Sequence, residues 1–186
     1  MKEVSGAMKV SLAAIKTLRE KTGAPIGNVR SALEEAGGDL SKANEILRQK
    51  GFEAAKKRQE RVTSAGRVES YIHHNGGVGV LIEVNCETDF VARTPEFQQF
   101  CREIAMHIAS QSPVVVKKDD LTPKQLEDAK AIGKTPEQFA REAALLEQPF
   151  IKDQGQTIGQ LLTALIAKTG ENVVIRRFCR FALNDR

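Results

Sequence analysis

The chain has 186 residues, of which 41% are hydrophobic and 28% charged, and its formal net charge is +4. This length and composition fit one well-packed core, alone or with a small satellite domain, and exclude a chain that is disordered by composition. The sequence shows neither an apolar run of about 18 residues nor a signal-peptide pattern, so we expect a cytoplasmic protein without a membrane partner.

The first fifty residues show three stretches with apolar residues at helical spacing. The first is expected to begin after Ser11 and to end at Gly23, and the third to begin at Asp39 and to end before Gly51. We predict a three-helix module over residues 1–51 that leaves an apolar patch for a partner. Its apolar positions are Leu12, Ile15, Leu18, Ile26, Val29, Leu33, Leu40, Ala43, Ile46 and Leu47.

Residues 52–65 are charged, have few apolar anchors and include the basic run KKRQER. We interpret this segment as an exposed linker, either helical or flexible. No aromatic residue lies among the basic ones, as base stacking would require, so a solvated linker is favoured over a patch that binds nucleic acid directly.

Residues 68–73 and 78–86 alternate between apolar and polar, and the Asn-Gly pair between them favours a tight turn, so we predict a β-hairpin. The second strand ends at residues 87–91, which read ETDFV and are called the ETDFV turn below. Phe90 lies there beside two acids. A large aromatic at a turn either folds back into the core or is offered to another molecule.

The rest of the chain predicts helices and strands around this hairpin. A helix with one apolar stripe begins at Thr94, residues 112–117 are consistent with a short strand, and two short helices lie within 122–148. A further helix and a terminal strand follow. Alternation along that strand predicts that Val173, Ile175, Arg177, Cys179 and Phe181 share one face. We predict an α+β fold with an antiparallel-sheet core over residues 66–186, packed with helices.

Candidates for catalysis do not form a recognisable arrangement. His73 and His74 lack a third metal ligand at a useful spacing, and Glu87 and Asp89, which could together hold Mg²⁺, are more simply explained as hydrated carboxylates. The odd number of cysteines argues against a disulfide framework. We therefore predict no catalytic residues, no metal and no cofactor. The nucleophile and base candidates considered are Cys86, Cys101, Cys179, His73, His74 and His107.

Blocks spread over more than half of the chain closely resemble the elongation factor Ts family. They are LREKTGAPIGNVRSALEEAGGDLSKANEILRQKG, VLIEVNCETDFVART with PEFQQFCREIAMHIAS, and LLEQPFIKD, TIGQLL and GENVVIRRFCRF. The resemblance implies a guanine-nucleotide exchange factor that binds elongation factor Tu and promotes GDP release during translation elongation, without chemistry of its own. It also implies that the N-terminal module is of the ubiquitin-associated type and docks on the partner's GTPase domain.

The resemblance also implies which residues contact the partner. Asp89 and Phe90 match the pair that the family inserts near the Mg²⁺ and phosphate site of the GTPase, with Thr88 and Val91 beside them. His107 matches a histidine at the same interface. The segment matching the family's docking loop carries Pro-Ile-Gly where long members have a glycine and two methionines. Its residues are Gly23, Ala24, Pro25, Ile26 and Gly27.

Compared with long members of the family, this chain carries the core motif once, and its segment 117–142 is compressed. We therefore predict a two-fold homodimer, in which a second chain replaces the missing half. Phe178, Cys179 and Phe181 on the terminal strand are the expected interface residues, and oxidation could link the two copies of Cys179.

Three alternatives stay open at this point. The pI of about 9.0 and the basic linker would suit a nucleic-acid-binding protein. The first fifty residues alone would suit a ubiquitin-associated adaptor. An enzyme would need one activated cysteine.

Overall fold

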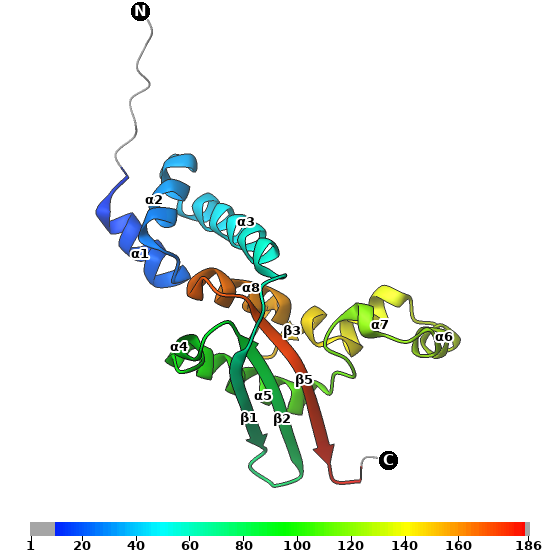
Figure 1. Ribbon diagram of the computed structural model, residues 1–186. Helices are drawn as coiled ribbons and strands as arrows, with labels where there is room; N and C mark the ends of the chain where they lie inside the picture. The colour runs from blue at the N-terminus through cyan, green and yellow to red at the C-terminus, as the bar shows by residue number, and fades with distance from the viewer. Residues whose placement is uncertain (1–9, 185–186) are drawn as a thin grey trace, which may run out of the picture.

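The computed structural model describes residues 10–184, and it has the predicted α+β architecture (Figure 1). Residues 1–9 of the predicted module and residues 185–186 of the predicted core lie outside the described part. No helix within the described part is long and apolar enough to cross a membrane. In chain order the elements are α1 (Leu12–Thr22), α2 (Ile26–Glu35), α3 (Leu40–Arg58), β1 (Ala65–Ile72), β2 (Val78–Cys86), α4 (Asp89–Ala92), α5 (Pro95–Gln111), η1 (Lys118–Asp120), α6 (Pro123–Ala131), α7 (Pro136–Ala143), η2 (Leu145–Glu147), β3 (Pro149–Phe150), β4 (Asp153–Thr157), α8 (Ile158–Thr169) and β5 (Val173–Ala182).

Helices α1, α2 and α3 form the N-terminal module and bury an apolar cluster of their own. Ser11 and Asp39 cap α1 and α3 through their side chains, and Gly23 ends α1 in the left-handed conformation with φ of 65°. These caps and the three helices confirm the prediction from spacing. The buried residues of this cluster are Leu18, Val29, Ala32, Leu33 and Ala43.

Helix α3 is longer than predicted, and the expectation that it ends before Gly51 is wrong. It continues to Arg58. Residues 52–58 of the predicted linker are therefore helical, which is one of the two forms expected for that segment. Gly51 lies where α3 meets α8, and a methyl group there would stand 3.3 Å from Cβ of Ala167. The glycine therefore permits a close helix contact and does not end the helix. The extension also buries Ala55 in the main core.

Strands β1, β2 and β5 form one antiparallel sheet with β2 in the centre. The predicted hairpin is confirmed, because β1 pairs with β2 from Ala65 opposite Cys86 to Ile72 opposite Gly79. Strand β5 pairs with the other edge of β2, with Val173 opposite Cys86. The central strand therefore leads directly into the ETDFV turn, and both of its neighbours hold it in place.

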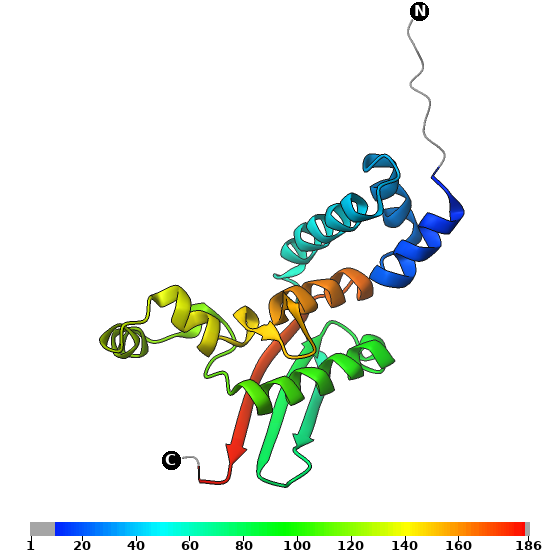
Figure 2. The same cartoon turned by 180° about the vertical axis from the view of Figure 1, so that it is seen from behind.

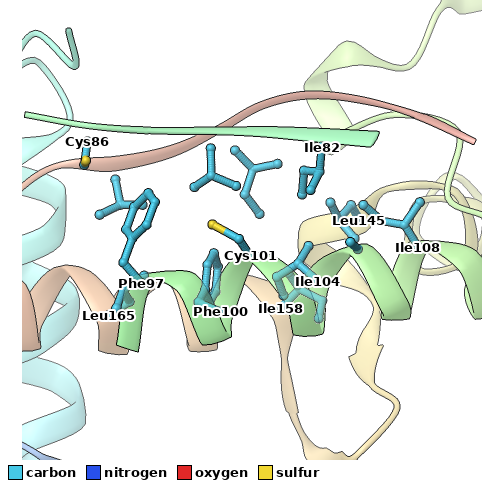
Figure 3. Packing of buried hydrophobic residues seen from close by; sticks show 14 of the residues in the cluster. Ile82, Cys86, Phe97, Phe100, Cys101, Ile104, Ile108, Leu145, Ile158 and Leu165 are labelled. Carbon is cyan, nitrogen blue, oxygen red and sulfur yellow. The ribbon is translucent and has the colours of Figure 1, made fainter. Parts of the chain in front are cut away.

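Helices α5 and α8 cover one face of the sheet, and the main core lies between these helices and the sheet (Figures 2 and 3). The apolar stripe predicted for the helix after Thr94 is this buried face of α5. The inward-facing residues of β2, the second strand of the predicted hairpin, lie against this face of α5, as their alternation predicted. Core residues in this layer include Val80, Ile82, Val84, Phe97, Phe100, Cys101, Ile104, Ile108, Leu145, Ile158, Leu165 and Ile175.

The other face of the sheet is turned toward the viewer in Figure 1, and no helix of the described chain covers it. Apolar side chains are exposed on it, and we call this surface the open face. Its apolar residues are Val68, Ile72, Leu81, Cys179 and Phe181.

Strand β5 does not alternate as strictly as predicted. Its pairing with β2 shifts by one residue, because Glu83 stands opposite Arg177 while Val84 stands opposite Ile175. Arg176 is the extra residue of a β-bulge. Beyond the bulge the two faces exchange, so the prediction that Ile175 and Cys179 share one face is wrong: Ile175 is buried in the core, and Cys179 lies on the open face.

The segment between α5 and α8 contains two differences from prediction. Residues 112–117 form no strand and make only an isolated bridge, between Val115 and Ala144. The two predicted short helices are present as α6 and α7, each begun by a Thr-Pro pair with a capping box. The region before α8, for which no strand was predicted, contains the small antiparallel pair β3 and β4.

Candidate functional site

The ETDFV turn connects the central strand β2 to helix α5 through the short helix α4. Thr88 is the N-cap of α4, and its side-chain oxygen accepts a hydrogen bond from the N–H of Val91. Thr94 caps α5 in the same way through the N–H of Phe97. Two threonine caps in close succession thus define the path of the chain, and α4 projects from the end of the sheet (Figure 1).

Phe90 points into solvent, with 79% of its surface exposed. Its neighbour Asp89 is also exposed and pairs with Arg93 of the same helical turn at 2.8 Å. The structure therefore excludes the fold-back of Phe90 into the core. It leaves a large apolar side chain beside a carboxylate at the tip of a turn, an arrangement typical of a contact with another molecule.

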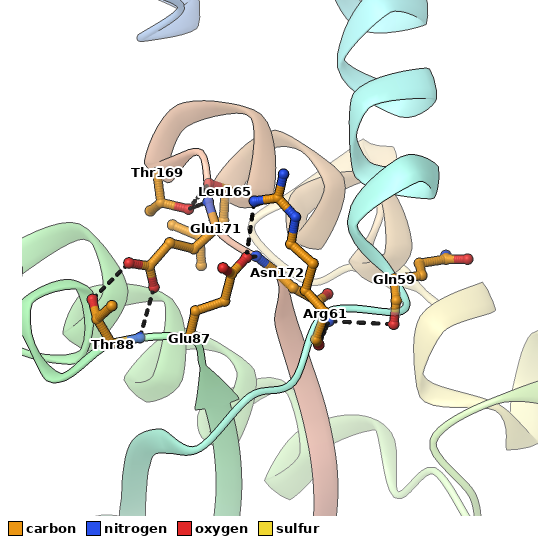
Figure 4. A network of polar contacts seen from close by, with 8 residues as sticks. All are labelled: Gln59, Arg61, Glu87, Thr88, Leu165, Thr169, Glu171 and Asn172. Carbon is orange, nitrogen blue, oxygen red and sulfur yellow. Dashed lines mark hydrogen bonds and ion pairs between the residues drawn. The ribbon is translucent and has the colours of Figure 1, made fainter.

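A carboxylate from a distant part of the chain holds the base of this turn (Figure 4). Glu171, between α8 and β5, accepts two hydrogen bonds from Thr88: one from the backbone N–H at 3.0 Å and one from the hydroxyl at 2.6 Å. The hydroxyl has a single proton, which it donates to Glu171, so toward Val91 it can only accept. Glu171 thereby fixes the hydroxyl in the orientation that caps α4.

The residue next to Glu171 binds the other side of the turn. The backbone N–H of Asn172 donates to Glu87 Oε1 at 2.6 Å, and the same carboxylate pairs with Arg61 at 3.5 Å. The buried side chain of Asn172 donates to the carbonyl oxygens of Arg61 and Gln59, which lie just beyond α3. Residues 171–172, called the clamp below, thus join the ETDFV turn to the chain that leaves the N-terminal module.

The predicted docking loop, residues 23–27, comprises the connection between α1 and α2 and the first two residues of α2, Ile26 and Gly27. Ile26 is 62% exposed, and Pro25 and Gly27 are exposed beside it. Ala24 is half-buried against the cluster of the module. At its start the loop lies against α8, because a methyl group at Gly23 would stand 3.1 Å from a side-chain carbon of Lys168.

His107 is the one predicted contact residue that the structure buries completely, with 0% of its surface exposed. Its Nε2 lies 2.9 Å from the side-chain oxygen of Gln148, which can only accept, so Nε2 carries the proton and donates. The other ring nitrogen, Nδ1, is buried and has no hydrogen-bond partner. Burial lowers the pKa of His107, so the ring is held neutral. In this conformation His107 supports α5 from inside, and its contact with a partner stays a prediction.

The three predicted interface residues of β5 divide between the two faces of the sheet. Phe181, 71% exposed, and Cys179 lie on the open face. Phe178 lies on the covered face and packs against the protein's own core. The bulge at Arg176 decides this division, because it sets which residues after it point outward.

Two of the three thiols lie in environments that oppose reactivity. Burial raises the pKa of Cys86 to about 11, with the nearby charge of Glu171 as the second cause, and burial raises the pKa of Cys101 to about 12. A nucleophilic cysteine needs the opposite shift. Among residues 10–184 no three metal-binding side chains gather at one point. These thiol environments oppose a role for Cys86 or Cys101 as a nucleophile.

The sequence did not identify the clamp residues as part of the site. They are separated by more than eighty positions from the turn that they hold. The one local signal is that two polar side chains directly follow Gly170, the left-handed C-cap of α8. This marks a loop, and it does not identify the partner of either side chain.

Comparison of the sequence with known proteins identifies its family. A sequence profile of the family described as Elongation factor TS matches residues 13–138. Elongation factor Ts of Rubrobacter xylanophilus is 48% identical, in an alignment that covers 95% of this chain and 100% of that protein. Elongation factor Ts of Koribacter versatilis is 47% identical, covering 96% of this chain and 90% of that protein. That of Caldanaerobacter subterraneus is also 47% identical, with 92% and 96% covered. The chain belongs to the elongation factor Ts family of translation elongation factors.

Proposed function

We propose that this protein is a guanine-nucleotide exchange factor, which binds elongation factor Tu in the cytoplasm and promotes release of GDP. The observation that carries the proposal is the exposed Phe90 beside Asp89, at the tip of a turn whose base is held by the clamp. The protein acts by binding alone, without a cofactor or a covalent step. The docking loop, with exposed Ile26, contacts the GTPase domain of the same partner, and His107 supports the interface.

Exchange by binding requires a difference in affinity between two states of the partner. A factor that binds the nucleotide-free GTPase more tightly than the loaded one speeds nucleotide loss, and by linkage the nucleotide then expels the factor. Burying a phenylalanine side chain contributes about 1.5–3 kcal/mol. If Phe90 is buried only in the open state of the partner, this corresponds to about one or two decades in the equilibrium.

Asp89 adds an electrostatic component to this effect. A carboxylate brought close to a bound Mg²⁺ competes with the oxygen ligands and waters that hold the ion. Asp89 is exposed and is neutralised only by a surface pair with Arg93, and such pairs contribute little. The carboxylate can therefore leave Arg93 at small cost when the turn meets its partner.

The test is the rate of GDP release from purified elongation factor Tu, with and without this protein. We expect wild-type protein to accelerate release and Phe90→Ala to lose most of the stimulation, by about tenfold or more. Ile132→Ala is the matched control, because Ile132 is 70% exposed but follows α6, far from the turn (Figure 1). Equal stimulation by Phe90→Ala and wild type would reject the role of Phe90, and no stimulation by wild type would reject exchange itself.

Each alternative function would give a different experimental result. A nucleic-acid-binding protein would bind RNA with an affinity that falls steeply with salt. An adaptor would bind through its first fifty residues and leave GDP release unchanged. A thiol enzyme would lose activity on a single Cys→Ser change.

We also propose that the protein forms a two-fold homodimer through the open face. This face joins apolar side chains from all three strands, and Arg177 and Glu83 form an ion pair of 2.7 Å on it. Both an apolar patch and charges of opposite sign can meet their own copies across a two-fold axis. Cys179 and Phe181 would then lie at the interface, while Phe178 would support the strand from the covered side.

Sedimentation at micromolar concentration tests the dimer. Phe181→Glu should shift wild-type dimers to monomers, because it places a charge within the apolar contact. Ile132→Glu adds the same charge to an exposed apolar position off the sheet and should leave the dimer intact. A wild-type protein that sediments as a monomer would refute the proposal.

A further inference from the structure

We infer that Glu171 is a positioning residue for Phe90, which acts through Thr88 and contacts no partner itself. The inference rests on the proposed function, because it assigns a role to Glu171 in presenting the side chain that meets the GTPase. It also makes a statement about the free protein, which can be tested without any partner. Four geometric observations support it.

The first observation is that Glu171 satisfies both donors of a single residue. The N–H and the hydroxyl of Thr88 both bind its carboxylate, one oxygen each. Hydrogen bonds to an ionised acceptor are stronger than those between neutral groups, and two parallel bonds also fix orientation. Thr88 therefore cannot rotate or shift without breaking a two-point contact.

The second observation is that the contact controls the start of α4. Thr88 Oγ1 accepts the N–H of Val91, at 3.4 Å, while its proton points to Glu171, which holds a lone pair toward the helix. Helix α4 has four residues, Asp89–Ala92, and is too short to be stable by its own backbone bonds. Its cap and the contacts at its base must hold it, and Phe90 is its second residue.

The third observation is that the core gives Phe90 no anchor of its own. At 79% exposure its side chain makes few contacts within the protein, so packing does not fix the direction of the turn. The polar contacts at positions 87 and 88 do so instead. An exposed aromatic held in one orientation loses less conformational entropy on binding than one on a mobile loop.

The fourth observation is that the clamp continues to the N-terminal module. Asn172 binds Glu87 through its backbone and the carbonyl oxygens of Gln59 and Arg61 through its side chain. The same two-residue loop therefore holds the ETDFV turn and the end of the chain leaving α3. If the docking loop and Phe90 contact one partner, the clamp sets the distance between these two contacts.

The first experiment measures amide hydrogen exchange in the free protein. Glu171→Ala should lower the protection of the Thr88 and Val91 amides by about tenfold or more, because the acceptor and the ordered cap are lost. The Phe97 amide is the internal control, since Thr94 caps it in the same way without a carboxylate from another segment. Glu127→Ala, which removes an exposed carboxylate from α6, should change none of the three.

The second experiment measures GDP release from elongation factor Tu in a double-mutant cycle. Glu171→Ala alone should lose part of the stimulation, less than Phe90→Ala loses. In the Phe90→Ala background the same change should have no further effect, within about twofold, because Glu171 acts through the side chain that is already absent. Glu171→Gln keeps the size of the side chain and one acceptor oxygen, so its stimulation of GDP release should fall between those of wild type and Glu171→Ala. This second variant keeps the test decisive if the alanine variant folds poorly.

The outcomes separate this inference from the proposed function. Unchanged protection of Thr88 and Val91 in Glu171→Ala overturns the inference, whatever the exchange assay gives. Equal losses from Glu171→Ala in the wild-type and Phe90→Ala backgrounds also overturn it, because Glu171 would then act independently of Phe90. If wild-type protein does not accelerate GDP release, the proposed function fails, and hydrogen exchange still decides whether Glu171 holds the turn.

Discussion

Phe90 on the ETDFV turn and Phe97 on helix α5 lie close together in the chain, yet 79% of Phe90 is exposed and 0% of Phe97. Both follow a threonine cap, Thr88 in one case and Thr94 in the other. What differs is the partner of each segment. The face of α5 lies against the sheet, whereas α4 projects beyond the end of the sheet and is held from below by polar contacts.

Position relative to the sheet, and not residue type, therefore decides whether each of these two aromatic side chains contributes to stability or to binding. Phe97 stabilises the fold, and Phe90 remains available for binding. Substitutions in the two regions should therefore affect different measurements.

Phe97→Ala should lower the free energy of unfolding by about 3–5 kcal/mol, because it leaves a cavity between α5 and the sheet. Denaturant unfolding followed by circular dichroism measures this loss. Phe97→Leu, which refills much of the volume, should recover a large part of it. A loss below about 1 kcal/mol would show that the site collapses or that Phe97 is not a core residue in solution.

Asn172→Ala should lower the free energy of unfolding by about 1–3 kcal/mol, because two backbone carbonyl oxygens beyond α3 lose their donor. The measurement is again denaturant unfolding. Asn28→Ala, on the exposed surface of α2, is the matched control and should stay within about 0.5 kcal/mol of wild type. If both variants behaved alike, the contact of the Asn172 side chain with the chain beyond α3 would contribute nothing to stability.

His107 should make stability depend on pH. Its pKa in the folded state is lowered by burial, so below the unfolded value of about 6.5 the unfolded chain binds more protons and stability falls as pH decreases. The slope contributed by this group is at most about 1.4 kcal/mol per pH unit. Unfolding at several pH values between about 7.5 and 5 should show a steeper fall for wild type than for His107→Gln. Parallel curves would contradict a buried neutral ring.

Phe90→Ala should change the free energy of unfolding by no more than about 0.5 kcal/mol, because the side chain is mostly exposed. Thermal and denaturant unfolding of this variant beside wild type provide the measurement. A destabilisation above about 1 kcal/mol would mean that Phe90 packs against the protein in solution, and the contrast with Phe97 would then be lost.

Local patterns predicted most of the fold. Caps, helical spacing and strand alternation identified the three-helix module, the hairpin, α5 and the two Thr-Pro helices, because each depends on neighbours a few positions away. Gly51 misled the prediction for α3, since a glycine is a helix end in isolation and a close-contact residue beside Ala167. That second role depends on where α8 lies, which short-range patterns do not contain.

The candidate site likewise contains residues that local sequence patterns identify and residues that they do not. Phe90 could be singled out because a large aromatic at a turn is unusual in any sequence. Glu171 and Asn172 could not, because polar residues after a helix are ordinary and their importance comes from contacts with Thr88 and Glu87 across the fold. The burial of His107 was not foreseen either, although it lies on the helix whose apolar stripe was recognised.

The bulge at Arg176 has a consequence for how this protein can change. In strand β5, Val173 and Ile175 face the core before the bulge and Phe178 faces it beyond the bulge, so one continuous segment contains two sets of positions under different constraints. Deleting Arg176 would remove the extra residue and restore strict alternation. Each remaining residue would keep its partner on β2, so Cys179 and Phe181 would stay on the open face and Phe178 on the covered face. The bulge therefore adds one residue to the strand without altering which side chains the sheet buries.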